Sequence, residues 1–437
     1  MPSRRSAAAD LVIETAKKMT SPAALEEIVL SRGGRVPSND GDSRPMWEPL
    51  SLAYGFPGVT LLYAELGHHD PYFRDVAHEY LRAAAPHAIR APVGGGLYSG
   101  LTSFAFSARI AAHRPKDYSV LRARADTRVG NFASQYSSQY KRALADGSQA
   151  RAFHSFDVIN GMSGVGRHLL RSGPEQTSAV KAILEYLIEL TVPRSRHDGL
   201  LPGWWVDHGM NIGEDIPGGH GNFGLAHGVS GPLGVLSLAW HQGHQSDNAR
   251  AAIHRMAEWL LQWRQTDSHG VFWPTGITLP QLAGGASVTA TRPSWCYGTP
   301  GIANALRLAG KALGEDLWVD TAHDAVRAAA ARSRATPVLE QPGLCHGLSG
   351  LLFGLETFRR ERPCALLDEA VESTVREIEG RYNPDTPFGF TVPQEVSGLQ
   401  LDHVGFLDGV AGMLLALWAY ATGEQPRSGW DAALVMS

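Results

Sequence analysis

The 437-residue chain is predicted to be all-α, with its helices arranged as an α/α toroid, a double ring of seven helical hairpins. Two observations predict this fold. A Gly-x-x-Gly element followed by an apolar helix recurs along the chain, and amphipathic helical segments lie between the copies. Helices that are apolar on nearly all faces must be enclosed, so we expect them in an inner ring with the amphipathic helices outside.

The Gly-x-x-Gly element occurs in seven copies, one of them degenerate. Their second glycines are Gly58, Gly100 (the degenerate copy), Gly164, Gly231, Gly301, Gly350 and Gly412. Each interval is long enough for a helical hairpin. We expect every element at the N-terminus of an inner helix, all at one mouth of the ring, where glycines let backbones approach closely and leave amide donors available.

Two stretches do not follow the helical alternation. Residues 192–223 and 268–294 are rich in Gly, Pro and aromatic residues and contain strand-like pieces, so we expect small β-containing insertions beside the mouth. The first is the better candidate for an inserted subdomain that grips a polymeric substrate. Residues 1–45 are expected to form a short helix and a polar linker, and residues 46–437 the toroid domain.

Composition excludes several classes of protein. The net charge of −4 is spread without a basic stripe, which argues against nucleic acid or an anionic membrane surface as partners. Three cysteines cannot form a disulfide framework and suit a reducing compartment. No apolar window of about 18 residues occurs, so we expect a soluble, cytoplasmic protein.

Two of the three cysteines stand in equivalent places before Gly-x-x-Gly elements. Cys296 lies in WCYG, and Cys345 precedes His346 in LCHG. Thiolate and imidazole are the usual zinc ligands, and three of them leave a fourth position open, as in catalytic sites. The alternative is that each cysteine is a small buried hydrophobe. Cys364 lacks this setting and is expected in the core.

Five motifs carry a resemblance to a known family: FDVINGMSGVG, GNFGLAHGVSGPL, RPSWCYGTPGIANAL, LCHGLSGLL and GFLDGVAGMLLAL. From about Leu50 onward the chain resembles the lanthipeptide cyclases of the LanC family in their stand-alone bacterial form. The resemblance implies an α/α toroid that binds one Zn²⁺ through Cys296, Cys345 and His346. It also implies an enzyme that closes thioether rings by adding peptide Cys thiols to dehydroalanine or dehydrobutyrine.

The resemblance implies partners as well. The substrate would be a dehydrated precursor peptide, made of a leader and a core, and the dehydration would be done by a separate dehydratase. A transporter complex is a further partner that the resemblance allows, and it would hold this cytoplasmic protein at a membrane.

Three further residues acquire roles from the resemblance. His227 matches the family's active-site histidine and would protonate the enolate, while Asp157 would orient its imidazole. Arg292 falls where the family has an arginine facing the site and would stabilise the enolate. Each has a structural alternative: a histidine satisfied by backbone, an N-cap aspartate, and a salt bridge that holds the insertion.

Other polar and aromatic residues near the mouth remain open. Three histidines in glycine-rich stretches are expected to be exposed loop residues rather than substrate contacts: His208, His220 and His403. Three tryptophans would either pack a peptide or anchor the insertions: Trp204, Trp205 and Trp295. Tyr297 would hydrogen-bond near the metal or pack. Asp408 repeats the position held by Cys or His in other copies and is expected to act as a helix cap rather than a catalyst.

Three other functions compete with ring closure. An α/α-barrel glycosidase or epimerase would need paired carboxylates, and the mouth holds mainly Cys and His. A related enzyme could use the same zinc site to add a small thiol such as glutathione to dehydrated protein residues. A non-catalytic scaffold would only bind the precursor peptide and its dehydratase.

Overall fold

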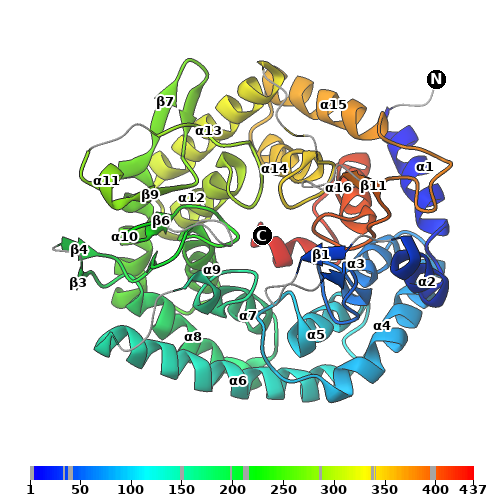
Figure 1. Cartoon of the computed structure of the whole chain (residues 1–437), viewed down its shortest axis with the longest axis horizontal. Helices are drawn as coiled ribbons and strands as arrows, with labels where there is room; N and C mark the ends of the chain where they lie inside the picture. Colours follow the sequence, from blue (N-terminus) through cyan, green and yellow to red (C-terminus); the bar gives the residue numbers. More distant parts are fainter. Residues whose placement is uncertain are drawn as a thin grey trace. The chain divides into compact units, whose positions relative to one another are not determined.

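The structure is a computed structural model, shown in Figure 1. It describes residues 4–32, 35–37, 43–147, 152–196, 199–209, 216–284, 288–335, 339, 341–393 and 400–437. The chain forms two compact units. The first contains Met1–Gly94, Tyr98–Ala125 and Pro337–Trp430, and the second contains Gly95–Leu97, Asp126–Thr336 and Asp431–Ser437.

The first unit pairs buried helices with amphipathic ones. The helices that follow Gly-x-x-Gly elements are α3 (Phe56–Leu66), α5 (Gly100–Ile110), α14 (Leu348–Glu361) and α16 (Val410–Thr422). All residues of α3 are buried, as are those of α16 from Val410 to Tyr420. The amphipathic partners are α4 (Tyr72–Arg90) and α15 (Ala365–Glu379). Wholly apolar helices are therefore enclosed, as predicted.

The N-terminal region contains two helices rather than one helix and a linker, namely α1 (Arg4–Lys17) and α2 (Pro22–Arg32). Helix α1 packs against α16 and buries Ala8, Val12 and Ala16. The hydroxyl of Tyr63 donates to the carbonyl of Ala16 at 2.7 Å, and that of Tyr80 donates to a carbonyl just beyond α1. Helix α1 is thus the amphipathic partner of α16, the last buried helix.

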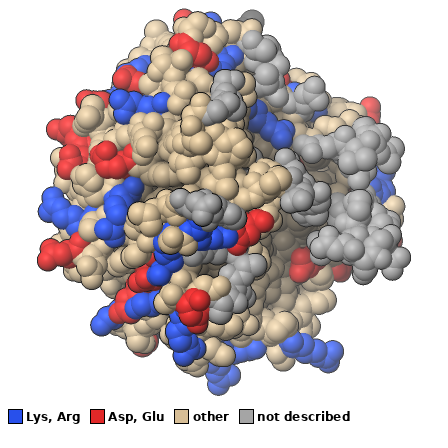
Figure 2. All heavy atoms as spheres, turned by 60° about the vertical axis from the view of Figure 1, so that its left-hand side comes forward, with Lys and Arg blue, Asp and Glu red and all other residues tan. Residues whose placement is uncertain are grey.

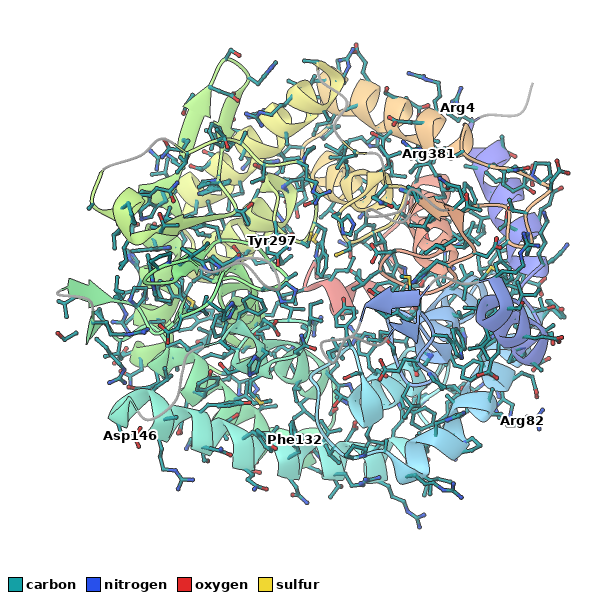
Figure 3. All side chains as sticks on the ribbon, in the orientation of Figure 1. Arg4, Arg82, Phe132, Asp146, Tyr297 and Arg381 are labelled. Atoms are coloured by element: carbon teal, nitrogen blue, oxygen red, sulfur yellow. The ribbon has the colours of Figure 1, made fainter. Side chains whose placement is uncertain are left out.

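The second unit repeats the same pairing. Its buried helices are α7 (Met162–Leu169), α9 (Ser230–His241) and α12 (Thr299–Leu313). Its amphipathic helices are α6 (Ser119–Asp146), α8 (Thr177–Glu189), α10 (Asp247–Trp263) and α13 (Asp316–Ala335). Phe132 and Asp146 lie along helix α6, whereas Tyr297 lies two residues before α12 (Figure 3).

The final segment of the chain, Asp431–Ser437, belongs to this second unit and contains most of the 3₁₀ helix η3 (Trp430–Leu434). Side chains next to or within the buried helices hold its backbone. The indole Nε1 of Trp295 donates to the carbonyl of Leu434 at 2.9 Å, and the amide of Asn304 donates to that of Val435 at 3.0 Å. The segment therefore packs against the residue that precedes Cys296.

The two insertions predicted to contain strands pair with each other. Strands β5 (Trp205–Val206), β6 (His220–Asn222) and β9 (Gly276–Thr278) form one antiparallel sheet in the order β5-β6-β9. Two-stranded sheets make up the remainder: β3 (Arg194–Arg196) with β4 (Gly199–Leu201), β7 (Gln265–Asp267) with β8 (Gly270–Phe272), β1 (Arg35–Pro37) with β2 (Ser43–Pro45), and β10 (Val392–Pro393) with β11 (Gln400–Leu401). Helix α11 (Leu279–Leu282) and the 3₁₀ helices η1 (Phe153–Ser155) and η2 (Pro174–Gln176) complete the elements.

Four of the Gly-x-x-Gly loops, those before α7, α9, α14 and α16, fold back onto the first turn of the helix that they begin. Before α16, the N–H groups of Val410, Ala411 and Gly412 donate to the carbonyls of residues 403–405. The same three bonds recur before α14. The first N–H groups of an α-helix have no partner within the helix, so these carbonyls satisfy them. The expectation that the amide donors stay available at the mouth is therefore wrong for these helices.

This fold-back requires both glycines. A Cβ atom on the second glycine would lie about 2 Å from a loop carbonyl oxygen, namely 2.0 Å at Gly58, Gly164 and Gly301 and 1.9 Å at Gly412. On the first glycine it would meet a loop backbone nitrogen, at 2.2 Å for Gly298 and Gly409 and 2.3 Å for Gly161. No side chain fits at either place, which explains why the pair recurs.

The surface carries charges of both signs. On the face drawn in Figure 2, acidic and basic side chains are intermixed over the area that is not grey. Among the described residues, no helix has the length and apolarity that crossing a bilayer requires.

Replacing a second glycine tests the fold-back directly. We expect Gly301→Ala to lower the free energy of unfolding by about 1–3 kcal/mol, because its Cβ must displace the backbone carbonyl of Trp295. Denaturant unfolding measures this difference. In Gly199→Ala the nearest heavy atom is 3.8 Å from the new Cβ, so that control should stay within about 0.5 kcal/mol of the parent chain. Equal stability of the two variants would contradict the steric account.

Candidate metal and acid–base site

Backbone hydrogen bonds join three Gly-x-x-Gly loops of the second unit. The N–H of Val158 donates to the carbonyl of Ala226 at 3.0 Å, and the N–H of Ala226 donates to that of Cys296 at 3.1 Å. The loops touch so closely that a Cβ on Gly224 would lie 2.5 Å from the Cys296 carbonyl oxygen. Residues far apart in sequence, including Asp157 and His227, are thereby brought together.

Asp157 and His227 form a hydrogen-bonded pair. The Nδ1 atom of His227 lies 2.5 Å from Oδ2 of Asp157, whose side chain is fully buried. The other carboxylate oxygen accepts the backbone N–H of Asn160 at 2.6 Å. An ionised carboxylate only accepts hydrogen bonds, so Nδ1 carries the proton and Nε2 is the nitrogen that can exchange one. The His227 side chain is 21% exposed, which leaves it accessible.

Aromatic rings flank this imidazole. The centroid of Phe153, in η1, lies 4.7 Å from that of His227, and the Tyr297 centroid lies 5.8 Å away. Phe153 also meets the half-buried ring of His208 edge-on at 4.5 Å. These rings restrict how the imidazole can turn. Sequence reasoning missed Phe153, because it lies outside the Gly-x-x-Gly motif and only its neighbours in space identify it.

Arg292 stands six residues before Gly298, at the start of the loop that contains Cys296. Its carbonyl accepts the N–H of Ser294 at 2.8 Å, and the residue is exposed. In the equivalent place of other loops, Asn222 and His403 point a side-chain atom at their own loop backbone. The catalytic role expected for Arg292 stays a prediction.

Cys345 and His346 lie on a loop of the first unit whose neighbour is the loop of Asp408. The carbonyl of Leu407 accepts the N–H of Cys345 at 2.9 Å. Nδ1 of His346 lies 3.8 Å from Oδ1 of Asp408. Tyr98, which the motif search did not single out, is buried nearby. Burial, together with the charge of Cys345, raises the pKa of the Tyr98 phenol well above its usual range.

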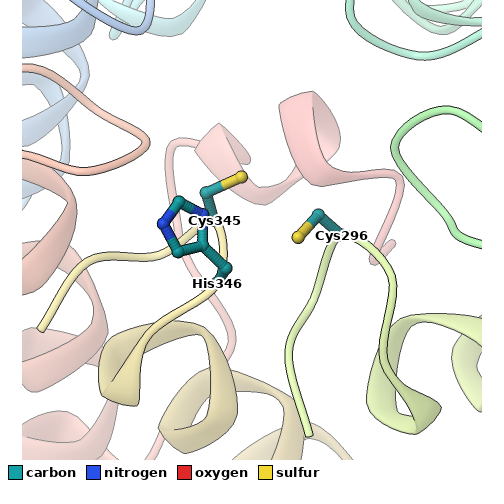
Figure 4. A group of neighbouring side chains, drawn as sticks. All are labelled: Cys296, Cys345 and His346. Atoms are coloured by element: carbon teal, nitrogen blue, oxygen red, sulfur yellow. The ribbon is translucent and has the colours of Figure 1, made fainter. Parts of the chain in front are cut away.

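Cys296, Cys345 and His346 make up a group of potential metal ligands among the described residues (Figure 4). One ligand atom of each lies within 4.8 Å of the others. Cys296 is buried, with Sγ 3.6 Å from the Ser294 hydroxyl, whereas the other two are half-buried. Two thiols and one imidazole are a donor set that suits zinc, with one coordination position left for another ligand.

Several sequence expectations need correction. His220 and His403 are buried, not exposed loop residues. Cys364 is half-buried at the N-cap of α15 rather than in the core. The three tryptophans act as anchors, since Trp204, Trp205 and Trp295 are all buried.

The buried state of His403 has a local cause. Its Nδ1 accepts the N–H of Gly405 at 3.3 Å, just as Oδ1 of Asn222 accepts the N–H of Gly224 at 2.8 Å in the equivalent loop. Burial lowers the pKa of His403 to about 4. The ring is therefore a neutral acceptor that supports its loop.

Comparison with known proteins agrees with this picture. The family model for lanthionine synthetase C-like protein matches residues 46–435. The nisin biosynthesis protein NisC of Lactococcus lactis subsp. lactis is 25% identical over 383 residues, which cover 84% of this chain and 84% of that protein. A solved structure of nisin cyclase superposes with a TM-score of 0.72 at 22% identity, covering 90% of this chain and 93% of the other.

The structural likeness shows the fold class, a helical toroid with small added sheets, as predicted. The family model spans most of the sequence. The chain therefore belongs to the lanthionine synthetase C-like protein family.

The histidine of the Gly409 loop makes folding stability depend on pH. Because the folded-state pKa of His403, about 4, is lower than the unfolded value of about 6.5, its neutral form contributes stability above pH 6.5. That contribution is lost as the pH falls from 6.5 to 4, at a cost of about 3 kcal/mol.

His403→Asn should remove this acid sensitivity, because Asn222 makes the equivalent bond with a side chain that does not titrate. Denaturant unfolding at a series of pH values gives the comparison. If the variant and the parent lost the same stability between pH 6.5 and 4, the assignment to His403 would be wrong.

Proposed function

We propose that the protein is a zinc-dependent cyclase that forms lanthionine or methyllanthionine rings in a dehydrated precursor peptide. The observation that carries the proposal is the group of Cys296, Cys345 and His346, whose ligand atoms lie within 4.8 Å of one another. Membership of the lanthionine synthetase C-like family supports this reaction. In the reaction a peptide Cys thiol adds across the double bond of a dehydroalanine or dehydrobutyrine. A C–S bond forms at Cβ, and a proton is delivered to Cα.

The three ligands would hold Zn²⁺, which when bound lowers the pKa of a coordinated thiol and so supplies a nucleophile at neutral pH. Two thiolates and a neutral imidazole cancel the charge of the metal. This balance suits thiol chemistry, because a substrate sulfur would keep its electron density. The thiol proton leaves to solvent or to a nearby base, and an equivalent proton must return to Cα of the product.

His227 is proposed to deliver that proton from Nε2. Its bond to Asp157 orients the ring, and the buried carboxylate stabilises the charged imidazolium. Phe153 and Tyr297 flank the ring and keep it in this orientation. Arg292, with its permanent charge, is proposed to stabilise the enolate oxygen that develops after sulfur addition.

The proposed substrate is a peptide with a leader and a core, supplied by a separate dehydratase. Strands β3–β6 belong to the region proposed to grip it, and Leu200 in β4 is 72% exposed there. Stable association with the dehydratase, or with a transporter at a membrane, is a further part of the proposal.

Removing one ligand tests the metal and the reaction together. Cys345→Ala should lose bound zinc and ring closure, because two remaining ligands hold zinc weakly. Metal analysis of the purified protein measures the first, and mass spectrometry of the peptide after thiol alkylation measures the second. Cys364→Ala is the matched control and should retain both. Ring closure by a zinc-free Cys345→Ala protein would refute the proposed enzyme.

Asp157→Asn separates acid–base chemistry from metal binding. The variant should retain zinc but cyclise at least about 100-fold more slowly, since general acid catalysis contributes about 10²–10⁴-fold. Single-turnover ring closure, followed by mass spectrometry, gives the rate. An unchanged rate would remove the Asp157–His227 pair from the mechanism.

Two other functions are distinguished by the same assays. An enzyme that adds glutathione to dehydrated residues would give a glutathione adduct of the peptide in place of a ring. A scaffold would bind the peptide and form neither product.

A further inference from the structure

Asp408 occupies the same place in its repeat as two residues with proposed functions. It stands directly before the first glycine of its element, as His227 and His346 do in theirs. Its side chain is 19% exposed, so it is partly enclosed rather than freely solvated. Its place before a helix predicts a cap, which the hydrogen bonds at the start of α16 test.

The cap is not needed. Gly409 is the N-cap residue of α16 and has no side chain with which to cap that helix. The first N–H groups of α16 instead donate to the carbonyls of residues 403–405. Those N–H groups therefore do not depend on a side chain at Asp408.

The backbone at Asp408 is pressed against the ligand loop. The carbonyl of Leu407 accepts the N–H groups of both Leu344 and Cys345, at 2.6 and 2.9 Å. A Cβ atom on Gly343 would lie 2.7 Å from the Cα of Asp408. These contacts all lie within the first unit, and they hold Asp408 in register with Cys345 and the residue after it.

The carboxylate then reaches the imidazole of His346. Oδ1 of Asp408 lies 3.8 Å from Nδ1 of His346, within ion-pair range but too long for a direct hydrogen bond. Asp408 does not belong to the group of potential ligands found among the described residues, which contains only Cys296, Cys345 and His346. It therefore adds negative charge next to the site.

We propose that Asp408 is a positioning residue, whose carboxylate orients the His346 imidazole and stabilises the positive charge that a bound cation places on it. This inference rests on the proposed zinc function. Carboxylates that support a ligating histidine typically raise metal affinity 10- to 100-fold. Because the contact here lacks a direct hydrogen bond, the lower end of that range is expected.

The test is the zinc affinity of the full-length protein, measured by competition with a chromophoric chelator. Asp408→Asn keeps the shape and removes the charge, so it should bind zinc about 10-fold more weakly. Asp408→Glu retains the charge and should recover most of the affinity. Asp368→Asn makes the same change at an exposed place on α15 and should bind zinc as the parent does. Affinity of Asp408→Asn within twofold of the parent would overturn the proposal.

Unfolding of the metal-free proteins separates this effect from damage to the fold. Parent and Asp408→Asn should melt at similar temperatures without metal and differ only once zinc is added. If Asp408→Asn fails to fold, Asp408→Ser takes its place under the same criterion. His346→Ala distinguishes the two levels of the hypothesis. If His346→Ala binds zinc like the parent, the proposed metal site fails. If His346→Ala loses zinc while Asp408→Asn retains it, only the role of Asp408 fails.

Discussion

The first turns of α7, α9, α14 and α16 donate hydrogen bonds to the loops that precede them, and the rest of the structure depends on this contact. Loop carbonyls accept the N–H groups that a helix start leaves without partners. The contact is possible only where two glycines stand three residues apart, because a Cβ atom at Gly161 or Gly164 would overlap the loop backbone. Each such loop is consequently short and held in a fixed position relative to its helix.

The loops also form backbone hydrogen bonds with one another. The carbonyl of Ala226 accepts a hydrogen bond from one neighbouring loop, and the N–H of Ala226 donates to another. In the first unit, the carbonyl of Leu407 accepts hydrogen bonds from the loop that contains Cys345. Since these bonds use only backbone atoms, they fix where the side chains start and leave the polar groups of those side chains available for other contacts. The pair of His227 with Asp157 and the approach of Asp408 to His346 both depend on such bonds.

Most of the fold could be predicted because its signals are local and repeated. Glycine pairs mark the starts of the inner helices, and uniform apolarity distinguishes α3 and α16 from their amphipathic partners. The role of α1 could not be predicted, because its fit against α16 depends on contacts between the two ends of the chain.

The residues of the candidate site likewise include some that the sequence predicts and some that it does not. Thiols and an imidazole one or two residues before a glycine are visible in sequence, so Cys296, Cys345 and His346 could be selected. His403 was misjudged, because a glycine-rich neighbourhood suggests exposure while its loop turns inward. Phe153 could not be found at all, since nothing in its local sequence indicates that it packs on His227.

The backbone-only links between loops have a consequence for how such a protein can change. The place before the first glycine holds tyrosine at Tyr54, asparagine at Asn160, histidine at His227 and aspartate at Asp408. Because these links between loops use backbone atoms, a different side chain at this place does not itself remove a hydrogen bond between the loops. The chemistry of the loop ends can therefore vary without a change in the backbone contacts that hold them.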